Sequence, residues 1–391
     1  MTILSDLSPL RLRGRTLLPI VQGGMGVGVS AHRLAGSVAK QGAVGTIASV
    51  DLRHLHPDLM EALGKSRDKD AINAANLVAL DREVRAAKAL AGGQGMIAVN
   101  VMRAVSQYAD YVQQACESGA DAIVMGAGLP LDLPDLTADH PHVALIPILS
   151  DVRGISLTLK KWQRKGRIPD AIVIEHPKHA GGHLGAAKPE DVGDARFDFA
   201  TVIPGALATF REMGIDPSRI PLIPAGGINS HEKVREVFAL GASAVQLGTP
   251  FAVSAEGDAH DIFKQVLAEA QPEDIVTFMS TAGLPARAVR TPWLETYFRK
   301  VGRLQEKAKQ VRGCTLGWDC LLQCGFRDGV SKFGQFCIDH HLAAALRGDR
   351  QHGLFFRGAE RLPFGSAIRP VRELIEYMLT GRMPATLARA A

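Results

Sequence analysis

Eight short apolar runs rich in β-branched residues recur along the first two-thirds of the chain, and stretches with helical periodicity separate them. The runs are residues 18–23, 44–49, 96–101, 122–126, 144–149, 171–174, 221–225 and 244–247. Strands that are apolar on both faces are typical of a parallel sheet buried beneath helices. Eight strand–helix units in about 250 residues are typical of a (β/α)8 barrel, the TIM barrel. We therefore predict an α/β protein with this barrel, and an open doubly wound sheet is the runner-up.

The strand–helix alternation ends after Phe251. The residues that follow have mostly helical periodicity, contain a cysteine-rich stretch over 314–337 and end in an amphipathic segment over 371–379. A chain of 391 residues also exceeds the usual size of a single hydrophobic core. We therefore predict two domains, a barrel of residues 1–254 and a smaller, mainly helical C-terminal domain of residues 255–391 that packs on the barrel mouth.

Composition excludes several classes of protein. No apolar run approaches the roughly 20 residues needed to cross a bilayer, and the first residues lack the continuous apolar core of a signal peptide. We therefore expect a cytoplasmic protein. The net charge is only +5 and aromatic residues make up 5% of the chain, whereas nucleic-acid binding favours a basic stripe with interleaved aromatics. A small molecule is the expected partner, and the sequence leaves a homodimer open.

Glycines mark the ends of four predicted strands, which is where barrel enzymes place their active sites. After the seventh strand, Gly226 and Gly227 lead into a predicted helix, and after the eighth, Gly248 and Thr249 offer two N–H groups and a hydroxyl. The loops after strands seven and eight commonly bind phosphate in barrels. These two ends therefore predict a phosphate clamp.

The sixth strand leads into a glycine-rich turn, in the sequence AIVIEHPKHAGGHLG over residues 171–185. Gly181 and Gly182 allow the backbone to approach a flat ligand, and His183 carries an imidazole that can face it. Together with the phosphate clamp, this turn predicts a phosphorylated planar cofactor, and flavin mononucleotide (FMN) fits those dimensions. A phosphate-binding barrel without redox chemistry is an alternative, although a phosphosugar site usually has more charged residues at the strand ends.

Four motifs, PIVQGGMG, HAGGHLG, PAGGI and AVQLGTPF, occur in the order and place in which the nitronate monooxygenase (2-nitropropane dioxygenase) family has them, and the chain resembles that family over residues 8–290. The superfamily also contains FMN-dependent enoyl-acyl-carrier-protein reductases (enoyl-ACP reductase II) and NAD(P)H:quinone reductases. The resemblance implies an FMN-binding barrel in which His183 is the catalytic histidine. The implied cofactor-binding residues are Gln22, Gly23, Gly24, Met25, Asn100, Ala180, Gly181, Gly182, Ala225, Gly226, Gly227, Gln246, Gly248 and Thr249.

Two activities are consistent with this resemblance. The first is oxidation of alkyl nitronates with O2, in which His183 holds the nitro oxygens as an imidazolium or takes an α-proton as a neutral base. The second is NAD(P)H-dependent reduction of an enoyl thioester or a quinone, in which His183 polarises the acceptor. We expect the nitronate monooxygenase activity. Pro250 stands where the family often has a basic residue. This departure bears on which substrate is bound and leaves the flavin prediction unchanged.

Four of the five cysteines, Cys314, Cys320, Cys324 and Cys337, lie in one short stretch. Clustered cysteines in a cytosolic chain indicate metal ligands before disulfides. The spacing C-x5-C-x3-C-x12-C lacks the paired C-x2-C arms of a zinc ribbon, so an iron–sulfur cluster is favoured over zinc. The alternative is that the four cysteines are small apolar residues of a helical domain.

Overall fold

Eight parallel strands close into a barrel in the computed structural model, which describes residues 3–310, 314 and 319–388. In barrel order the strands are β3 (Ile20–Gln22), β4 (Val44–Ala48), β5 (Met96–Met102), β6 (Ala122–Gly126), β7 (Ala144–Leu149), β8 (Ile172–Glu175), β10 (Leu222–Ala225) and β11 (Val245–Leu247). Each strand coincides with a predicted run to within a few residues, so the predicted (β/α)8 TIM barrel is confirmed.

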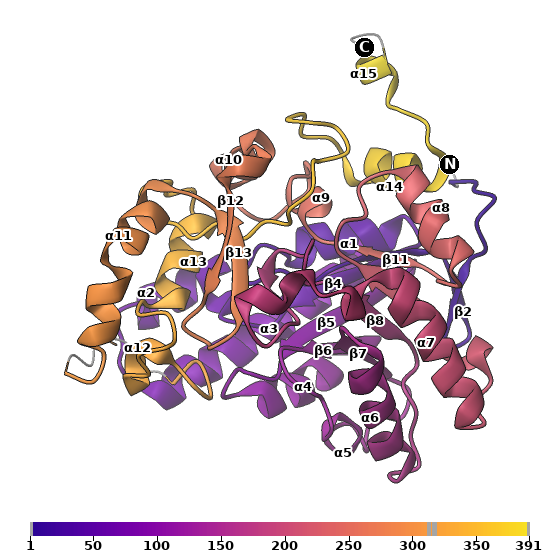
Figure 1. Cartoon of the computed structure of the whole chain (residues 1–391), viewed down its shortest axis with the longest axis horizontal. Helices are drawn as coiled ribbons and strands as arrows, with labels where there is room; N and C mark the ends of the chain where they lie inside the picture. Colours follow the sequence, from indigo (N-terminus) through magenta and orange to yellow (C-terminus); the bar gives the residue numbers. More distant parts are fainter. Residues whose placement is uncertain (1–2, 311–313, 315–318, 389–391) are drawn as a thin grey trace.

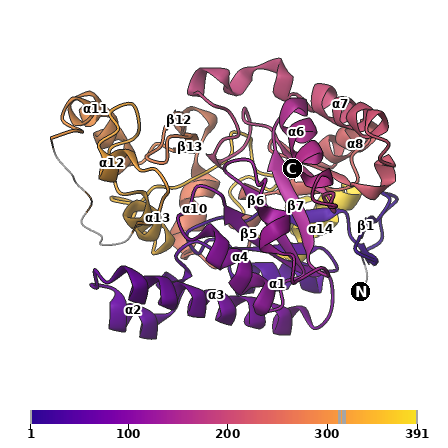
Figure 2. The same ribbon diagram turned by 90° about the horizontal axis from the view of Figure 1, so that it is seen from below.

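Helices follow the strands and cover the outside of the barrel (Figures 1 and 2). They are α1 (His32–Lys40), α2 (Pro57–Leu63), α3 (Lys69–Ala91), α4 (Tyr108–Glu117), α5 (Leu133–Leu136), α6 (Val152–Gln163), α7 (Phe199–Glu212), α8 (His231–Ala239) and α9 (Thr249–Ala252). Short 3-10 turns are η1 (Leu52–Leu55), η2 (Pro189–Gly193), η3 (Ala195–Phe197), η4 (Pro217–Arg219) and η5 (Pro272–Asp274). Local sequence sets several helix starts, because Asp68 caps α3, Asp151 caps α6 and Ser230 caps α8 with side-chain oxygens that accept backbone N–H groups.

A short hairpin closes the end of the barrel at which the strands begin. It consists of β1 (Leu10–Leu12) and β2 (Arg15–Leu17). Its leucines pack in one buried cluster with residues that begin the barrel strands, such as Val44 and Met96. Apolar side chains therefore fill this end of the barrel.

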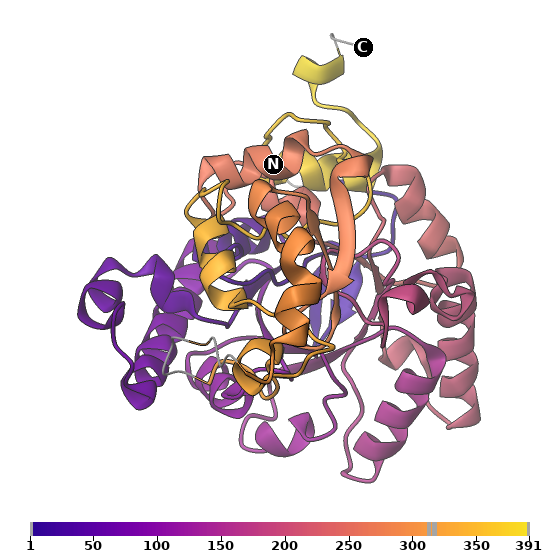
Figure 3. The ribbon, with the colours of Figure 1, turned by 60° about the vertical axis from the view of Figure 1, so that its left-hand side comes forward.

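The remaining elements form the C-terminal part, shown in orange and yellow in Figures 1 and 3. They are α10 (Asp261–Glu269), β12 (Ile275–Met279), β13 (Pro285–Val289), α11 (Pro292–Glu306), α12 (Gly325–Asp328), α13 (Ile338–Leu346), α14 (Val371–Thr380) and α15 (Ala385–Ala388). The predicted amphipathic helix is present as α14. Its apolar face joins the core formed by the outer helices of the barrel. The division into two domains at residue 254 stays a prediction.

One feature of this part was not predicted. Strands β12 and β13 form an antiparallel hairpin, and β13 pairs with the two-residue strand β9 (Gly182–His183), which belongs to the loop after β8. The C-terminal part is therefore helical with a three-stranded sheet, and this sheet reaches the predicted catalytic histidine. The sequence of β13, PARAV, lacks the β-branched and aromatic residues that mark strands.

A buried group of charges joins the loop after β4 to α13. The Arg53 Nε atom lies 2.6 Å from a carboxylate oxygen of Asp51, and the His54 Nε2 atom lies 3.1 Å from Asp51 and 3.9 Å from Asp339. Burial would lower the pKa of His54, but the carboxylates of Asp339 and Asp51 raise it to about 9. The imidazole is therefore charged at neutral pH and links the two carboxylates.

This charge group predicts a pH dependence of stability. The folded pKa of His54 lies above its ordinary value of 6.5, so its stabilising effect is complete below pH 6.5 and is lost as the pH rises toward 9. We expect the free energy of unfolding to fall over this range by up to about 3 kcal/mol more in the wild type than in His54→Gln. Thermal unfolding at both pH values measures the difference, and equal losses in the two proteins would contradict it.

Among the described residues no helix is long and apolar enough to cross a membrane.

Candidate active site

A cavity of about 720 Å³ opens at the carboxyl ends of the barrel strands. Its volume lies within the range of small-molecule and cofactor sites. Every predicted cofactor-binding residue except Gln22 lines it, and His183 lines it too. The residues brought together are Gly23, Gly24, Met25, Asn100, Ala180, Gly181, Gly182, Ala225, Gly226, Gly227, Gln246, Gly248 and Thr249.

Gln22 does not line the cavity. Its side chain is fully buried inside the barrel, where Oε1 accepts a hydrogen bond from the Thr46 N–H at 2.8 Å and Nε2 donates to the Gly23 carbonyl. Gln22 is the last residue of β3, one position before the chain reaches the rim. The side chain therefore crosslinks β3 and β4 and holds the Gly23 carbonyl at the rim, and a cofactor-binding role for Gln22 stays a prediction.

His183 is held at the cavity by the sheet that the C-terminal part contributes. Its backbone pairs with Ala286 of β13, its Nε2 atom lies 3.1 Å from the Ser280 hydroxyl, and its ring packs edge-on against Phe356. Burial lowers the pKa of His183 to about 4. The imidazole is therefore neutral at physiological pH and carries a single N–H, on Nδ1 or on the Nε2 that contacts Ser280.

Glu175 is a second ionisable group in the cavity, at the end of β8. Burial raises the pKa of its carboxyl to about 7, although a hydrogen bond with the Gly185 backbone and the charge of Arg287 act in the opposite direction. The carboxyl therefore changes charge near neutral pH. No role was predicted for Glu175. An acidic residue at the end of an otherwise apolar strand is the sequence signal that could have identified it.

Arg287 fixes the turn that leads to His183. Its guanidinium is buried and donates hydrogen bonds to the carbonyls of Pro177, at 2.9 Å, and Ala180. Since Arg287 also lies opposite Gly182 in the β9–β13 ladder, the turn is held by backbone and side chain from the same strand. This support positions the imidazole. It could not be predicted from the sequence, because Arg287 lies about a hundred residues from the turn.

Residues after α13 close the other side of the cavity. Phe356, Gly358, Glu360, Arg361 and Leu362 line it. The Gly358 N–H donates to the Thr249 hydroxyl at 3.0 Å, and the Ala359 N–H donates to the His179 carbonyl at 3.0 Å. The C-terminal part therefore completes the wall near the predicted phosphate clamp.

The glycines of the rim serve two different purposes. Gly226 and Gly227 have φ angles of +97° and +78°, which favour glycine in a tight turn. A β-carbon on Gly24 would lie 2.3 Å from the Asn100 Cβ atom, so this glycine allows the loop after β3 to approach the Asn100 side chain. At Gly248, by contrast, the nearest atom to an added β-carbon is the Met25 sulfur at 3.9 Å. Gly248 therefore faces open space at the cavity, as a glycine that leaves room for a ligand would.

The four cysteines of the predicted metal site lie apart from this cavity, and all are free thiols. Burial raises the pKa of the Cys320 thiol, and the nearby Asp339, Cys337, Cys324 and Cys314 raise it further. The four side chains are thus close enough to interact. No three of the thiols lie within 4.8 Å of one another, and in the described part of the chain only Asp51, His54 and Asp339 form such a group.

Comparison with known proteins assigns the family. The model of the nitronate monooxygenase family matches residues 12–381. The chain belongs to the nitronate monooxygenase family. A probable nitronate monooxygenase of Bacillus subtilis strain 168 is 29% identical over 288 residues, which are 71% of this chain and 78% of that protein. A nitronate monooxygenase of Pseudomonas aeruginosa is 33% identical over 120 residues, 31% of each chain.

Solved structures share the fold. FabK from Thermotoga maritima superposes with a TM-score of 0.62 at 23% identity, covering 92% of this chain and 91% of its own. A nitroalkane oxidase from Streptomyces ansochromogenes gives a TM-score of 0.61 at 20% identity, covering 95% and 96%. As a member of the nitronate monooxygenase family, the chain is an oxidoreductase, and the family implies a flavin cofactor. The open space at Gly248 and the glycine-lined rim fit such a group.

Proposed function

We propose that this chain is an FMN-dependent nitronate monooxygenase that oxidises alkyl nitronates with O2. The observation that carries the proposal is the position of His183 at a glycine-lined cavity, where pairing with β13, the Ser280 hydroxyl and the Phe356 ring hold it. The backbone of Gly226, Gly227, Gly248 and Thr249 would hold the phosphate of FMN. Bound FMN supplies the electron acceptor for the substrate and returns the electrons to O2.

The low pKa of His183 favours a nitronate over a neutral nitroalkane as the substrate. An imidazole with a pKa of about 4 is a weak base and would remove an α-proton inefficiently. A nitronate is already deprotonated, so it needs only a hydrogen-bond donor for its oxygens. A neutral imidazole can supply that donor, and the Ser280 hydroxyl and Phe356 ring fix its orientation.

A second activity, NAD(P)H-dependent reduction of an enoyl thioester or a quinone, is favoured by the apolar side chains of the cavity wall. They include the leucines Leu129, Leu157, Leu284, Leu342 and Leu354. Such a wall suits an acyl chain or a quinone ring better than a small nitronate. In that reaction His183 would donate its hydrogen bond to the carbonyl of the acceptor.

Anaerobic mixing separates the two activities. Flavin-loaded enzyme is mixed with propionate 3-nitronate, NADH or NADPH, and the visible flavin absorbance is followed. Bleaching by the nitronate and not by either pyridine nucleotide is the result expected for the monooxygenase. Bleaching by NADH or NADPH alone would overturn the proposal in favour of a reductase.

Glu175 predicts how nitronate oxidation depends on pH. Since its pKa is about 7, the carboxyl is neutral below that pH and negatively charged above it. A carboxylate in the cavity repels an anionic substrate, so kcat/KM should fall several-fold between pH 6 and pH 8. Glu175→Gln should remove most of this fall, and the same pH profile in both proteins would show that another group causes it.

A further inference from the structure

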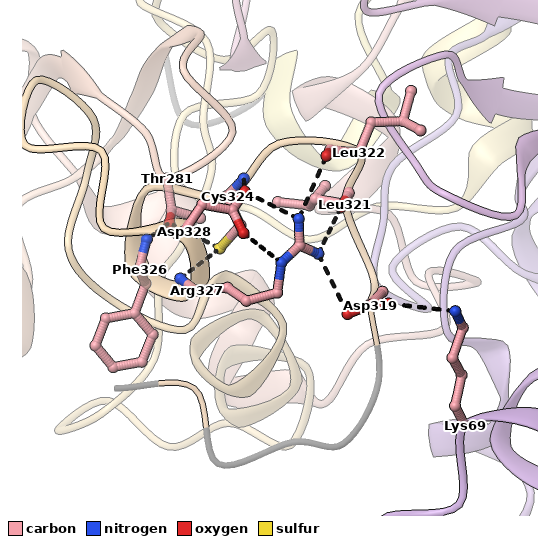
Figure 4. Close-up of polar contacts among 9 residues, drawn as sticks. All are labelled: Lys69, Thr281, Asp319, Leu321, Leu322, Cys324, Phe326, Arg327 and Asp328. Carbon is pink, nitrogen blue, oxygen red and sulfur yellow. Dashed lines mark hydrogen bonds and ion pairs between the residues drawn. The ribbon is translucent and has the colours of Figure 1, made fainter. Parts of the chain in front are cut away.

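The cysteine-rich segment has little regular structure to hold it. Over residues 319–337 the only helix is α12, which has four residues. Polar contacts hold the part around Arg327, as Figure 4 shows. Arg327 donates to the Leu321 and Leu322 carbonyls at 2.7 and 3.3 Å and pairs with Asp328 at 2.6 Å. A segment of this kind often depends on a bound metal for its fold.

The chain turns so that Cys324 faces the interior. The Cys324 Sγ atom lies 3.5 Å from the Thr281 hydroxyl and 3.4 Å from the Arg327 N–H, and its residue is only 6% exposed (Figure 4). The Arg327 N–H bond makes Cys324 the N-cap of α12, and hydrogen bonds to sulfur also tune the thiolates that hold iron–sulfur clusters. The fifth cysteine, Cys116, sits instead in the apolar core between strands and helices.

The four thiols do not form a ready-made site for a single metal ion. One zinc ion with Zn–S bonds of about 2.3 Å places its sulfur ligands about 3.8 Å apart. No three of the four thiols lie within 4.8 Å of one another, although all four share one region. A cluster of several iron and sulfide ions is larger than a single ion, so its cysteine ligands stand farther apart.

We propose that Cys314, Cys320, Cys324 and Cys337 bind an iron–sulfur cluster. This site is separate from the flavin cavity and does not depend on the activity proposed above. It lies next to the support of the catalytic histidine, because Ser280 contacts His183 while its neighbour Thr281 contacts Cys324. The Gly325 N–H donates to the Thr281 carbonyl at 2.7 Å and the Gly334 N–H donates to the Ser280 carbonyl at 3.0 Å. The cluster would therefore also fix the turn that orients His183.

Metal analysis tests the proposal. The full chain is produced with ample iron, purified without oxygen, and treated with ferrous iron and sulfide. We expect iron and acid-labile sulfide in equal amounts, about two to four of each per chain. Zinc alone, a disulfide between these cysteines, or four free thiols after this treatment would overturn it.

Variants identify the ligands. Cys324→Ser and Cys337→Ser should each lose at least half of the bound iron, whereas the matched control Cys116→Ala should keep it. FMN binding and circular dichroism show whether each variant is folded. Full iron content in both folded variants would overturn the assignment. Should either variant fail to fold, the iron and sulfide content of the wild type still decides whether a cluster is present.

Discussion

Replacing His183 by alanine is expected to slow turnover at least about a hundredfold while FMN stays bound. His183 lines the cavity but is not one of the rim residues that would hold the phosphate. Its replacement therefore leaves the phosphate site unchanged. What the variant loses is the one side chain that the β9–β13 sheet, Ser280 and Phe356 orient together.

A second substitution separates two roles of the same residue. His183→Gln keeps a hydrogen-bond donor but provides no base. If the imidazole donates to the nitronate, glutamine should recover part of the rate that alanine loses. Equal losses in the two variants would contradict the donor role, and unchanged turnover in both would remove His183 from the mechanism. Steady-state rates with propionate 3-nitronate, together with bound FMN per chain, supply the measurement.

Gly248→Val is expected to weaken FMN binding by at least about a hundredfold, or about 3 kcal/mol, without unfolding the protein. An added side chain at this position meets only the Met25 sulfur, at 3.9 Å from the first carbon, so it projects into the cavity and clashes with no backbone. Its bulk would occupy the space that we assign to the phosphate. Fluorescence titration with FMN measures the loss, and melting temperature reports the fold.

The matched control is Gly302→Val. Gly302 lies on the exposed side of α11, and an added β-carbon there meets no atom within 4 Å. This variant should bind FMN like the wild type. Normal FMN affinity in Gly248→Val would show that the phosphate lies elsewhere.

The barrel could be predicted because its strands are buried on both faces. Residues 122–126 and 144–149, for example, are continuous apolar runs that coincide with β6 and β7 in the structure. The residues on either side of such a run mark where the strand begins and ends to within a few residues. The rim glycines could be predicted in the same way, because a glycine directly after a strand marks where the chain leaves the barrel.

The sheet that positions His183 could not be predicted. Strand β9 has two residues, and β13 contains proline, alanine and arginine, so neither has a periodic pattern. Their pairing joins positions about a hundred residues apart, and no local signal reports such a contact. The orientation of the Gln22 side chain could not be predicted for a different reason. A shift of one residue along β3 moves a side chain from the rim to the barrel interior, and strand ends cannot be placed that finely from a sequence.

The central claim about this protein is that its cavity binds a flavin. Titration of the purified, flavin-stripped protein with FMN tests this directly, with absorbance, fluorescence quenching and calorimetry as readouts. We predict saturable binding of one FMN per chain with a resolved yellow spectrum, and weaker binding of riboflavin, which lacks the phosphate. A folded protein that takes up no FMN, or that binds riboflavin equally well, would contradict it.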